Sequence, residues 1–335
     1  MDRTDNILLN QILKITGFVV LFFLVLFLLN KVFMFKEGTA VGDFYKEERD
    51  TYEVILIGSS RMLFGIDPRI LKSEYDIDAY NFAQYGQHLP LNYYYVLDAI
   101  RTQHPKKVVL DVYRLDLELN EQTDDLVHMH ESIDNMVWSK NKIKAIHDLN
   151  SISNSPQYYL PFIYYHSRWK ELNKSDFVNG DETIFGYREL SSATPYDAFE
   201  IVPENEKLTP SDTVMEYLEK IRIVCEESGT ELVLINLLRY SPLDDGNLAI
   251  SDDMSEEEKV EINIKKSDCE TNLRLQKMAN GLADYAKEHN LLYINYNHII
   301  DEIDFDFKND MYDENHANIN GALKQTEYLG RMIKQ

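Results

Sequence analysis

Residues 52–61 read YEVILIGSSR, and this stretch decides the expected fold. Its first six residues form an apolar run of strand length, which is typical of a strand buried on both faces of a parallel sheet. Gly58 then permits a tight turn, and the residues that follow it open a helix. A buried strand that passes through a turn into a helix predicts an α/β fold whose functional site lies beyond the carboxyl ends of the strands.

Short apolar runs alternate with longer amphipathic segments along the rest of the chain. Further strands are expected at residues 79–82, 107–113, 231–237 and 291–295, and helices at residues 68–74, 90–102, 211–228, 268–288 and 320–333. This alternation predicts a doubly wound parallel-sheet sandwich over residues 50–335. Two segments interrupt it. Residues 118–205 are rich in aromatic side chains and are expected to form a cap, and residues 241–267 form a polar, acidic insertion.

Residues 15–35 read ITGFVVLFFLVLFLLNKVFMF and are almost entirely apolar. As a helix this segment is roughly 31 Å long, which matches the hydrocarbon core of one bilayer. Lys14 and Lys36 flank it. Because the segment is longer than the apolar part of a signal peptide and no A-x-A-like cleavage site follows, residues 1–36 are interpreted as an uncleaved, single-pass transmembrane anchor. The flanking charges are balanced and do not decide its orientation.

Acidic residues dominate the charge of the chain. Its 335 residues include 57 Asp and Glu against 34 Lys and Arg, for a formal net charge of −23. Such a surface repels phosphate backbones, so nucleic acid is not expected as a partner, and a neutral or cationic acceptor is favoured over an anionic one. With 44% hydrophobic residues, the chain can bury a sizeable core.

Three polar residues have the types and positions of a nucleophilic triad. Ser60 follows the first strand directly, while Asp313 and His316 stand three residues apart in YDENHANINGA, just before the last expected helix. This spacing lets the carboxylate hold the imidazole in one tautomer and stabilise the imidazolium that forms when His316 takes the proton of Ser60. A GSS tripeptide alone is more often an ordinary helix cap, but its pairing with a late D-x-x-H favours a serine nucleophile.

These motifs resemble those of the SGNH/GDSL hydrolase superfamily. Residues 58–60 look like its first block, with Ser59 where the family often has Asp and Ser60 as the nucleophile. Residues 81–87, NFAQYGQ, look like its second block, with Gly86 at the position of the oxyanion-hole glycine. The D-x-x-H motif matches its last block.

The resemblance covers residues 50–116 and 207–333, and one block departs from it. The family's Gly-x-Asn-Asp is expected near residues 111–114, where this chain has DVYR and no Asn. That departure and the N-terminal anchor make the chain similar to a membrane-anchored branch of the superfamily. The branch includes the D-alanine-transfer protein of teichoic-acid systems and the partners of polysaccharide O-acetyltransferases.

This branch implies an O-acyltransferase of the cell membrane whose catalytic domain is extracytoplasmic. Its implied partner is a membrane-bound O-acyltransferase, and its implied acceptor is a cell-surface polysaccharide or a teichoic-acid-like polymer. The acyl group would pass through an ester on Ser60, while backbone N–H groups near Ser60 and Gly86 hold the oxyanion. Two alternatives stay open: an esterase that deacetylates surface glycans, and a non-catalytic anchored binding module. The sequence does not determine the acyl group or the polymer.

The aromatic insertion contains YYLPFIYYHSRW at residues 158–169. His166 and Arg168 are predicted to reach the pocket above Ser60 and to bind substrate hydroxyls, because a polar pair buried in an apolar stretch needs partners. The alternative interpretation is a subdomain that simply buries its aromatic side chains.

Metal-ligand patterns are weak, and no metal or cofactor is expected. His128 and His130 form an H-x-H motif without a third ligand at a suitable spacing. The acidic run at residues 301–310 lacks the glycine and the terminal glutamate of an EF-hand loop.

Overall fold

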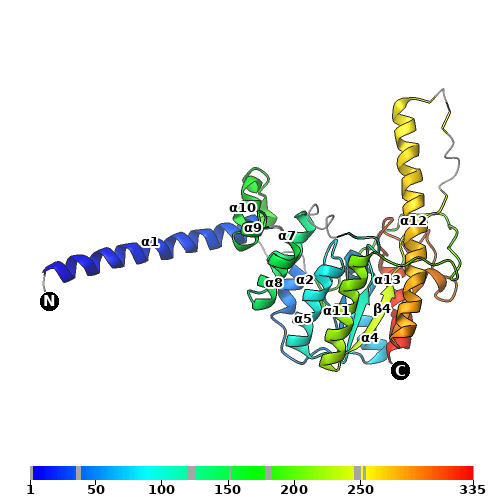
Figure 1. The fold of residues 1–335 in the computed structure, drawn as a ribbon, viewed down its shortest axis with the longest axis horizontal. Helices are drawn as coiled ribbons and strands as arrows, with labels where there is room; N and C mark the ends of the chain where they lie inside the picture. Colours follow the sequence, from blue (N-terminus) through cyan, green and yellow to red (C-terminus); the bar gives the residue numbers. More distant parts are fainter. Residues whose placement is uncertain are drawn as a thin grey trace.

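The structure is a computed structural model that describes residues 3–34, 39–118, 126–150, 152–177, 183–244, 250–251 and 254–334. A long N-terminal helix extends away from an α/β body, and a second long helix also projects from this body (Figure 1). Of the anchor predicted over residues 1–36, residues 1–2 and 35–36 lie outside this description.

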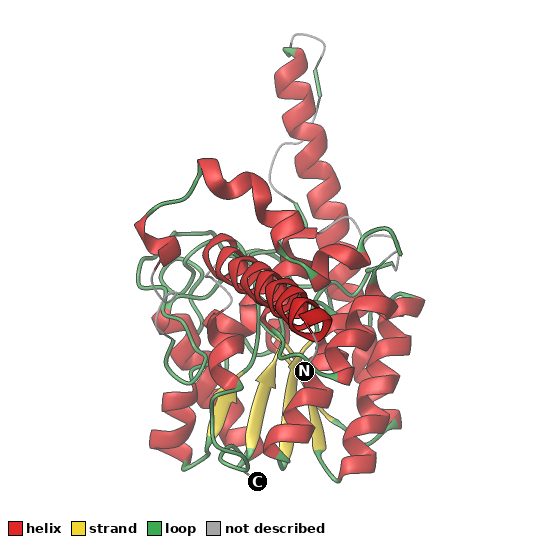
Figure 2. Cartoon of the chain, turned by 90° about the vertical axis from the view of Figure 1, so that its left-hand side faces the viewer, coloured by secondary structure: helices red, strands yellow, loops and turns green. Residues whose placement is uncertain are grey.

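Five parallel strands form one sheet in the order β2-β1-β3-β4-β5. They are β1 (Val54–Ile57), β2 (Ala79–Asn81), β3 (Lys107–Asp111), β4 (Glu231–Asn236) and β5 (Leu292–Asn295), and Figure 2 shows them in the body of the protein. The register pairs Ile57 with Leu110 and Asp111 with Ile235, so the carboxyl ends of β1, β3 and β4 meet at one edge. The chain places β2 on one side of β1 and the later strands on the other, and doubly wound sheets bind their ligands where this reversal occurs.

Helices cover both faces of the sheet. One face carries α5 (Leu89–Gln103), α11 (Asp212–Ser228) and α12 (Glu256–Glu288), and the other carries α3 (Ser60–Gly65), α4 (Pro68–Tyr75) and α13 (Ile319–Ile333). Alternate residues of β1 explain this arrangement, because Ile55 and Ile57 belong to the first core while Val54 and Leu56 belong to the second. Each fully buried aliphatic side chain stabilises the fold by about 1.5–3 kcal/mol. The parallel α/β arrangement predicted from the sequence is therefore observed.

α12 is longer than the sequence suggested, since it begins at Glu256 rather than near residue 268. Glu256, Glu257 and Glu258, which were assigned to the acidic insertion at residues 241–267, form the first turn of this helix. Residues 245–249 and 252–253 of that insertion lie outside the described residues. The Ser255 hydroxyl accepts the N–H of Glu258, and the Glu258 carboxylate accepts the N–H of Ser255, which together form a capping box. Acidic residues also interact favourably with a helix N-terminus. The N-terminal half of α12 projects from the body (Figure 1).

The insertion at residues 118–205 divides into three parts, apart from residues 119–125, 151 and 178–182, which the structure does not describe. First, α7 (Leu126–Asn135), α8 (Lys140–Leu149) and α9 (Ser155–Tyr159) extend the core on the α5 face. Second, α10 (Phe162–Tyr165) and the 3₁₀ turns η1 (His166–Lys170) and η2 (Lys174–Phe177) contact α1 (Arg3–Phe33). Third, the chain from Ile184 onward is extended and bonds to α3 and to the start of α13.

α1 contains the apolar segment of the predicted anchor. Its stretch Leu9–Phe33 has a mean hydropathy of 2.8 and is long and apolar enough to cross a membrane, by length and composition. The last turn of α1 rests on the insertion, where the Asn30 side-chain oxygen accepts the N–H of Phe162 at 2.7 Å. The rings of Phe33 and Phe162 also meet edge to face, with their centroids 5.5 Å apart. The helix is therefore attached to the body through the second part of the insertion.

Lys142 on α8 is buried, and among the described residues no carboxylate forms an ion pair with its ammonium group. Its side chain is 2% exposed, and Nζ donates to the carbonyl oxygens of Asp134 and Met136 at 3.0 Å each. The ammonium also lies 4.5 Å from the centre of the Trp138 ring. Burial lowers the pKa of Lys142 to about 8.

This shift predicts a stability gain at alkaline pH. Between about pH 8 and the ordinary lysine value, the unfolded chain binds the Lys142 proton more tightly than the folded chain does. The free energy of unfolding of the wild type should therefore rise with pH relative to Lys142→Met, by roughly 3 kcal/mol at most. Urea denaturation at a series of pH values measures this difference, and Lys144→Met removes an exposed lysine from the same helix as the control. A difference between wild type and Lys142→Met that stays constant with pH would contradict the prediction.

Candidate active site

Ser60, His316 and Asp313 form one hydrogen-bonded chain at the carboxyl edge of the sheet. Ser60 is the first residue of α3, directly after β1, and the other two lie in the loop before α13. His316 Nε2 is 2.8 Å from Ser60 Oγ, and His316 Nδ1 is 2.9 Å from Asp313 Oδ2. The structure thus brings together the three residues that the sequence singled out, at distances suited to proton transfer from the hydroxyl to the imidazole.

The D-x-x-H loop orients the carboxylate through its own backbone. Asp313 Oδ1 accepts the N–H groups of Asn315 and His316 at 2.8 and 3.0 Å, which leaves Oδ2 for the imidazole. Met311 and Ala317 pair as an antiparallel bridge and close the loop. The His316 ring packs edge to face on Phe64, with the centroids 5.1 Å apart. Backbone donors, a bridge and an aromatic contact therefore hold both groups in place before any substrate binds.

Close packing at the start of α13 holds this loop against the helix. The Asn318 side chain accepts the N–H groups of Asn320 and Gly321 and donates to the carbonyl oxygen of Asn309. Gly321 has no room for a side chain, since a Cβ there would lie 2.3 Å from the carbonyl oxygen of Asp310. The helix start and the triad loop are consequently one packed unit.

The residue after Ser60, Arg61, ties three strand ends together, and sequence reasoning did not find it. Its guanidinium donates to Asp111 Oδ1 at 2.9 Å and to the carbonyl oxygens of Val112 and Leu237 at 2.7 and 3.0 Å. Arg61 is 6% exposed and Asp111 is fully buried. Burial raises the pKa of the Asp111 carboxyl, and the Arg61 charge opposes that shift. A clue was present in the sequence, because Arg61 and Asp111 both follow apolar strands at the same edge.

Gly86 lies in the turn after β2 and has a φ of +57°, a conformation that glycine adopts readily. A hydrogen bond of 3.2 Å from the Gln84 N–H to the Gly58 carbonyl joins this turn to the turn that precedes Ser60. A Cβ on Gly86 would lie 2.3 Å from the His128 ring, so no larger residue fits. Within the described chain, neither the Gly86 nor the Ser60 backbone N–H makes a hydrogen bond. Both donors are therefore open to a ligand.

Residues 111–114 supply no replacement for the Asn that the family has in its third block. Asp111 acts as an acceptor for Arg61 and for the N–H of Leu237, so it cannot donate to an oxyanion in its ionised form. The Tyr113 ring lies beside Arg61, whose guanidinium carbon is 5.3 Å from the ring centre. This part of the edge holds Arg61 and does not provide a third amide donor.

The structure places Arg168 and His166 away from Ser60, which corrects the prediction that they bind substrate there. Arg168 Nη1 donates to the carbonyl oxygen of Phe33 at the end of α1, and Nη2 pairs with Asp176 at 2.7 Å. His166 is exposed and bonds to the carbonyl oxygen of Ile163. The polar partners of Arg168 are therefore the last turn of α1 and a carboxylate within the insertion, and not a substrate at Ser60.

The third part of the insertion, not its aromatic stretch, borders the triad. The N–H of Arg188 donates to the Leu63 carbonyl at 3.3 Å, and the N–H of Thr194 donates to the Met311 carbonyl at 2.9 Å. The Arg188 guanidinium bonds to the Tyr85 hydroxyl at 2.6 Å. The predicted cap over the site is thus reduced to one extended segment, and Asp313 keeps a side-chain exposure of 42%.

The histidines considered for a metal have other partners. His130 is fully buried, lies between the rings of Tyr158 and Tyr164, and bonds to Asp134 at 2.8 Å. His128 bonds to Glu131 at 2.9 Å. In the parts of the chain that the structure describes, no three His, Cys, Asp or Glu residues are grouped as metal ligands.

Fold and site together define a class of protein: a parallel α/β sandwich that carries a serine, a histidine and an aspartate in hydrogen-bonded sequence at the carboxyl edge of its sheet. No protein-family model matches the chain, and no curated protein matches it. Among solved structures, it is similar to a candidate lipolytic protein of the G-D-S-L family from Desulfitobacterium hafniense DCB-2. The two share 14% identity over 83% of this chain and 97% of the other, with a TM-score of 0.34. A likeness of this size carries no conclusion about activity.

Proposed function

We propose that this protein is a serine-dependent acyl-ester enzyme, and that its main reaction is the O-acylation of a cell-envelope polysaccharide through an acyl ester on Ser60. The observation that carries the proposal is the pair of hydrogen bonds that links Ser60 to His316 and His316 to Asp313. The resemblance of residues 58–60, 81–87 and 313–316 to the SGNH/GDSL blocks supports the same chemistry.

In the first half-reaction Ser60 is acylated. His316 Nε2 takes the proton of Ser60 Oγ, and Oγ attacks the carbonyl carbon of an acyl ester or thioester. Asp313 stabilises the imidazolium that forms, and the N–H groups of Ser60 and Gly86 hold the negative oxygen of the tetrahedral intermediate. The bond to the leaving oxygen or sulfur then breaks, His316 returns the proton to that atom, and an acyl ester on Ser60 remains.

In the second half-reaction the acyl group leaves Ser60. A sugar hydroxyl gives its proton to His316 and attacks the carbonyl carbon of the acyl ester. The bond to Ser60 Oγ then breaks, His316 returns the proton to Oγ, and the acylated sugar and free Ser60 remain. The same groups therefore act twice, with the histidine first a base and then an acid in each half.

The membrane setting supports transfer to a surface polymer. We place α1 in the cell membrane as a single-pass anchor and the α/β body on the extracytoplasmic side, where envelope polymers lie. A membrane-bound O-acyltransferase is the proposed source of the acyl group. The 25-residue apolar stretch of α1, which has the length of one membrane span, supports this arrangement.

Hydrolysis is the second candidate, and one observation favours it. Asp313 and His316 keep side-chain exposures of 42% and 19%, so the triad is open enough for water to reach the acyl ester. A polymer bound over the triad would exclude this water, whereas an esterase would use it. The acceptor therefore decides between the two reactions.

Both candidates are tested by following the acyl group on the full-length chain in detergent. With p-nitrophenyl acetate, mass spectrometry should find one acetyl group on Ser60, which hydrolyses slowly and leaves faster when acceptor oligosaccharides are added. Ser73→Ala, at an exposed serine on α4, is the control that should behave like the wild type. An acetyl ester that water removes quickly, and that no acceptor diverts, would make the protein an esterase. Absence of acylation at Ser60 would reject both reactions.

A further inference from the structure

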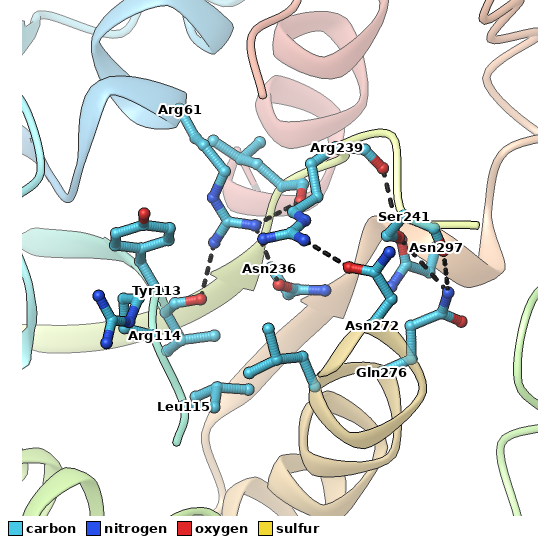
Figure 3. Close-up of a pocket in the computed structure, with 13 residues that line it drawn as sticks. Arg61, Tyr113, Arg114, Leu115, Asn236, Arg239, Ser241, Asn272, Gln276 and Asn297 are labelled. Atoms are coloured by element: carbon cyan, nitrogen blue, oxygen red, sulfur yellow. Dashed lines mark hydrogen bonds between the residues drawn. The ribbon is translucent and has the colours of Figure 1, made fainter. Parts of the chain in front are cut away.

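A small pocket with a charged lining lies beside the triad. It has a volume of about 40 Å³, sits beyond the carboxyl ends of β3 and β4, and is closed on one side by α12 (Figure 3). A larger groove of about 460 Å³ continues from it between α12 and the triad loop. Arg239 and Asn272 line both cavities, so they stand at the junction. The smaller volume exceeds the minimum for one water and suits a group the size of a carboxylate or a phosphate.

Three guanidinium groups line this pocket, those of Arg61, Arg114 and Arg239. Arg114 Nε lies 3.9 Å from Asp116 Oδ1, and Arg239 is the one that forms no ion pair over the described residues. Figure 3 shows Arg61, from α3, and Arg239, from the segment after β4, with their guanidinium groups side by side. Arg61 is paired with Asp111 at 2.9 Å. Arg239 donates to the neutral side chain of Asn272 at 2.5 Å, and over the described residues it forms no ion pair.

Over the described residues, the charge of Arg239 therefore has no carboxylate in direct contact with it, although Asp116 and Glu314 act on it from a greater distance. Burial and the nearby positive charge of Arg61 lower its pKa, although a guanidinium stays protonated at physiological pH. Asp116, which follows β3, is bonded to Arg274 at 2.6 Å. Arg239 is half-buried, so its guanidinium is partly removed from water, and an anionic ligand would offset that cost.

Neutral side chains of α12 fix the position of Arg239. The Asn272 amide donates to the carbonyl oxygen of Pro242 at 3.0 Å, and the Gln276 amide donates to that of Ser241 at 3.0 Å. These bonds hold the segment that carries Arg239 without adding negative charge. The guanidinium is thus oriented in advance, which favours binding because little conformational freedom is lost on association.

The pocket is joined to the triad through the backbone. The N–H of Tyr240, next to Arg239, donates to the carbonyl oxygen of Glu314 at 2.7 Å. Glu314 and Asn315, which separate Asp313 from His316, line the larger groove. The groove also carries Asp268 and Glu261, the second of which pairs with Lys265 at 3.3 Å. Carboxylates accept hydrogen bonds from hydroxyls, and Asp268 repels a second negative charge. Its chemistry fits a sugar chain with a single anionic group at the Arg239 end.

We propose that this pocket binds a carboxylate or phosphate oxyanion carried by the acceptor polymer, and that Arg239 is a specificity-determining residue for it. The proposal rests on the proposed function, because it names the class of acceptor: a glycopolymer with a negatively charged substituent near the hydroxyl to be acylated. It reverses the expectation of a neutral or cationic acceptor, which came from the net charge of the whole chain. The local charge at the pocket has the opposite sign.

Binding can be measured without catalysis, in the full-length Ser60→Ala protein in detergent. Three ligands of equal length are titrated by calorimetry: a glucuronate-containing oligosaccharide, a glycerol-phosphate oligomer and a neutral glucose oligosaccharide. At least one anionic ligand should bind about tenfold or more tightly than the neutral one. The stronger of the two anionic ligands identifies whether carboxylate or phosphate is the group recognised.

Arg239→Gln should remove this preference, and Arg239→Lys, which keeps the charge but not the planar fork, should retain part of it. Arg101→Gln, at the opposite end of α5 from the site, is the matched control for charge and should leave the preference unchanged. Equal binding of all three ligands, or an anion preference that survives Arg239→Gln, would overturn the proposal. Acylation of Ser60 is measured separately, in proteins that retain Ser60. The proposed triad is therefore tested by acylation, and the proposed anion pocket is tested by ligand binding.

Discussion

Ser60→Ala and His316→Ala are each expected to lower kcat for hydrolysis of an activated acetyl ester by roughly 10⁴-fold or more. In the proposed mechanism Ser60 carries the covalent ester, and His316, at 2.8 Å from its hydroxyl, is the only base in hydrogen-bond contact with it among the described residues. Asp313→Asn should have a smaller effect, because a carboxylate with 42% exposure can be replaced in part by water. Steady-state kinetics of the full-length protein in detergent measure all three.

The double variant gives the sharper test. If Ser60 and His316 act as one unit, Ser60→Ala/His316→Ala should be no slower than either single variant, because removing one already removes the shared step. Ser73→Ala should keep wild-type kinetics. Losses that multiply in the double variant, or activity that survives His316→Ala, would mean that the hydrogen-bonded chain is not the catalytic unit.

Asp111→Ala is expected to lower the free energy of unfolding by about 3–5 kcal/mol. The substitution leaves Arg61, which is 6% exposed, with a buried charge and no counter-ion. Arg61→Met should cost a similar amount, because it leaves the buried carboxylate alone and also frees the carbonyl oxygens of Val112 and Leu237. Urea denaturation followed by circular dichroism measures both losses.

Replacing both partners distinguishes a charge effect from a packing effect. Arg61→Met/Asp111→Leu should recover part of the lost stability, since no unpaired charge remains, although the two carbonyl groups still lack a donor. Arg222→Met breaks the surface ion pairs with Glu219 and Glu226 on α11 and should change stability by about 1 kcal/mol or less. A loss for Asp111→Ala as small as that for Arg222→Met would show that the pair does not hold the strand ends together.

Local patterns in the sequence determined the core of the fold. The apolar runs that became β1, β3 and β4 match the observed strands to within about two residues, because a strand buried on both faces must be apolar along its whole length. Ser60, Asp313 and His316 were found for a related reason. Each lies directly after a strand or before a helix, and parallel strands bring such positions to one edge.

The same patterns misplaced features that depend on distant partners. The charged start of α12 was assigned to a polar insertion, although Ser255 and Glu258 form a capping box that could have been identified from their spacing. Arg168 was predicted to reach the active site. An arginine in an apolar stretch needs a polar partner, but the sequence around it does not identify that partner. The end of α1, 135 residues away in sequence, supplies it.

The sequence by itself determined the doubly wound sheet, the apolar N-terminal helix and the three residues of the candidate triad. Only the tertiary structure decided that Arg61 is neutralised by Asp111 while Arg239, which follows β4 just as Arg61 follows β1, is held by the neutral Asn272. Periodicity specifies which side chains are buried, since burial repeats with the geometry of a strand or helix. Periodicity does not specify which buried charged side chains form ion pairs, because those contacts join distant segments at no regular spacing in the sequence.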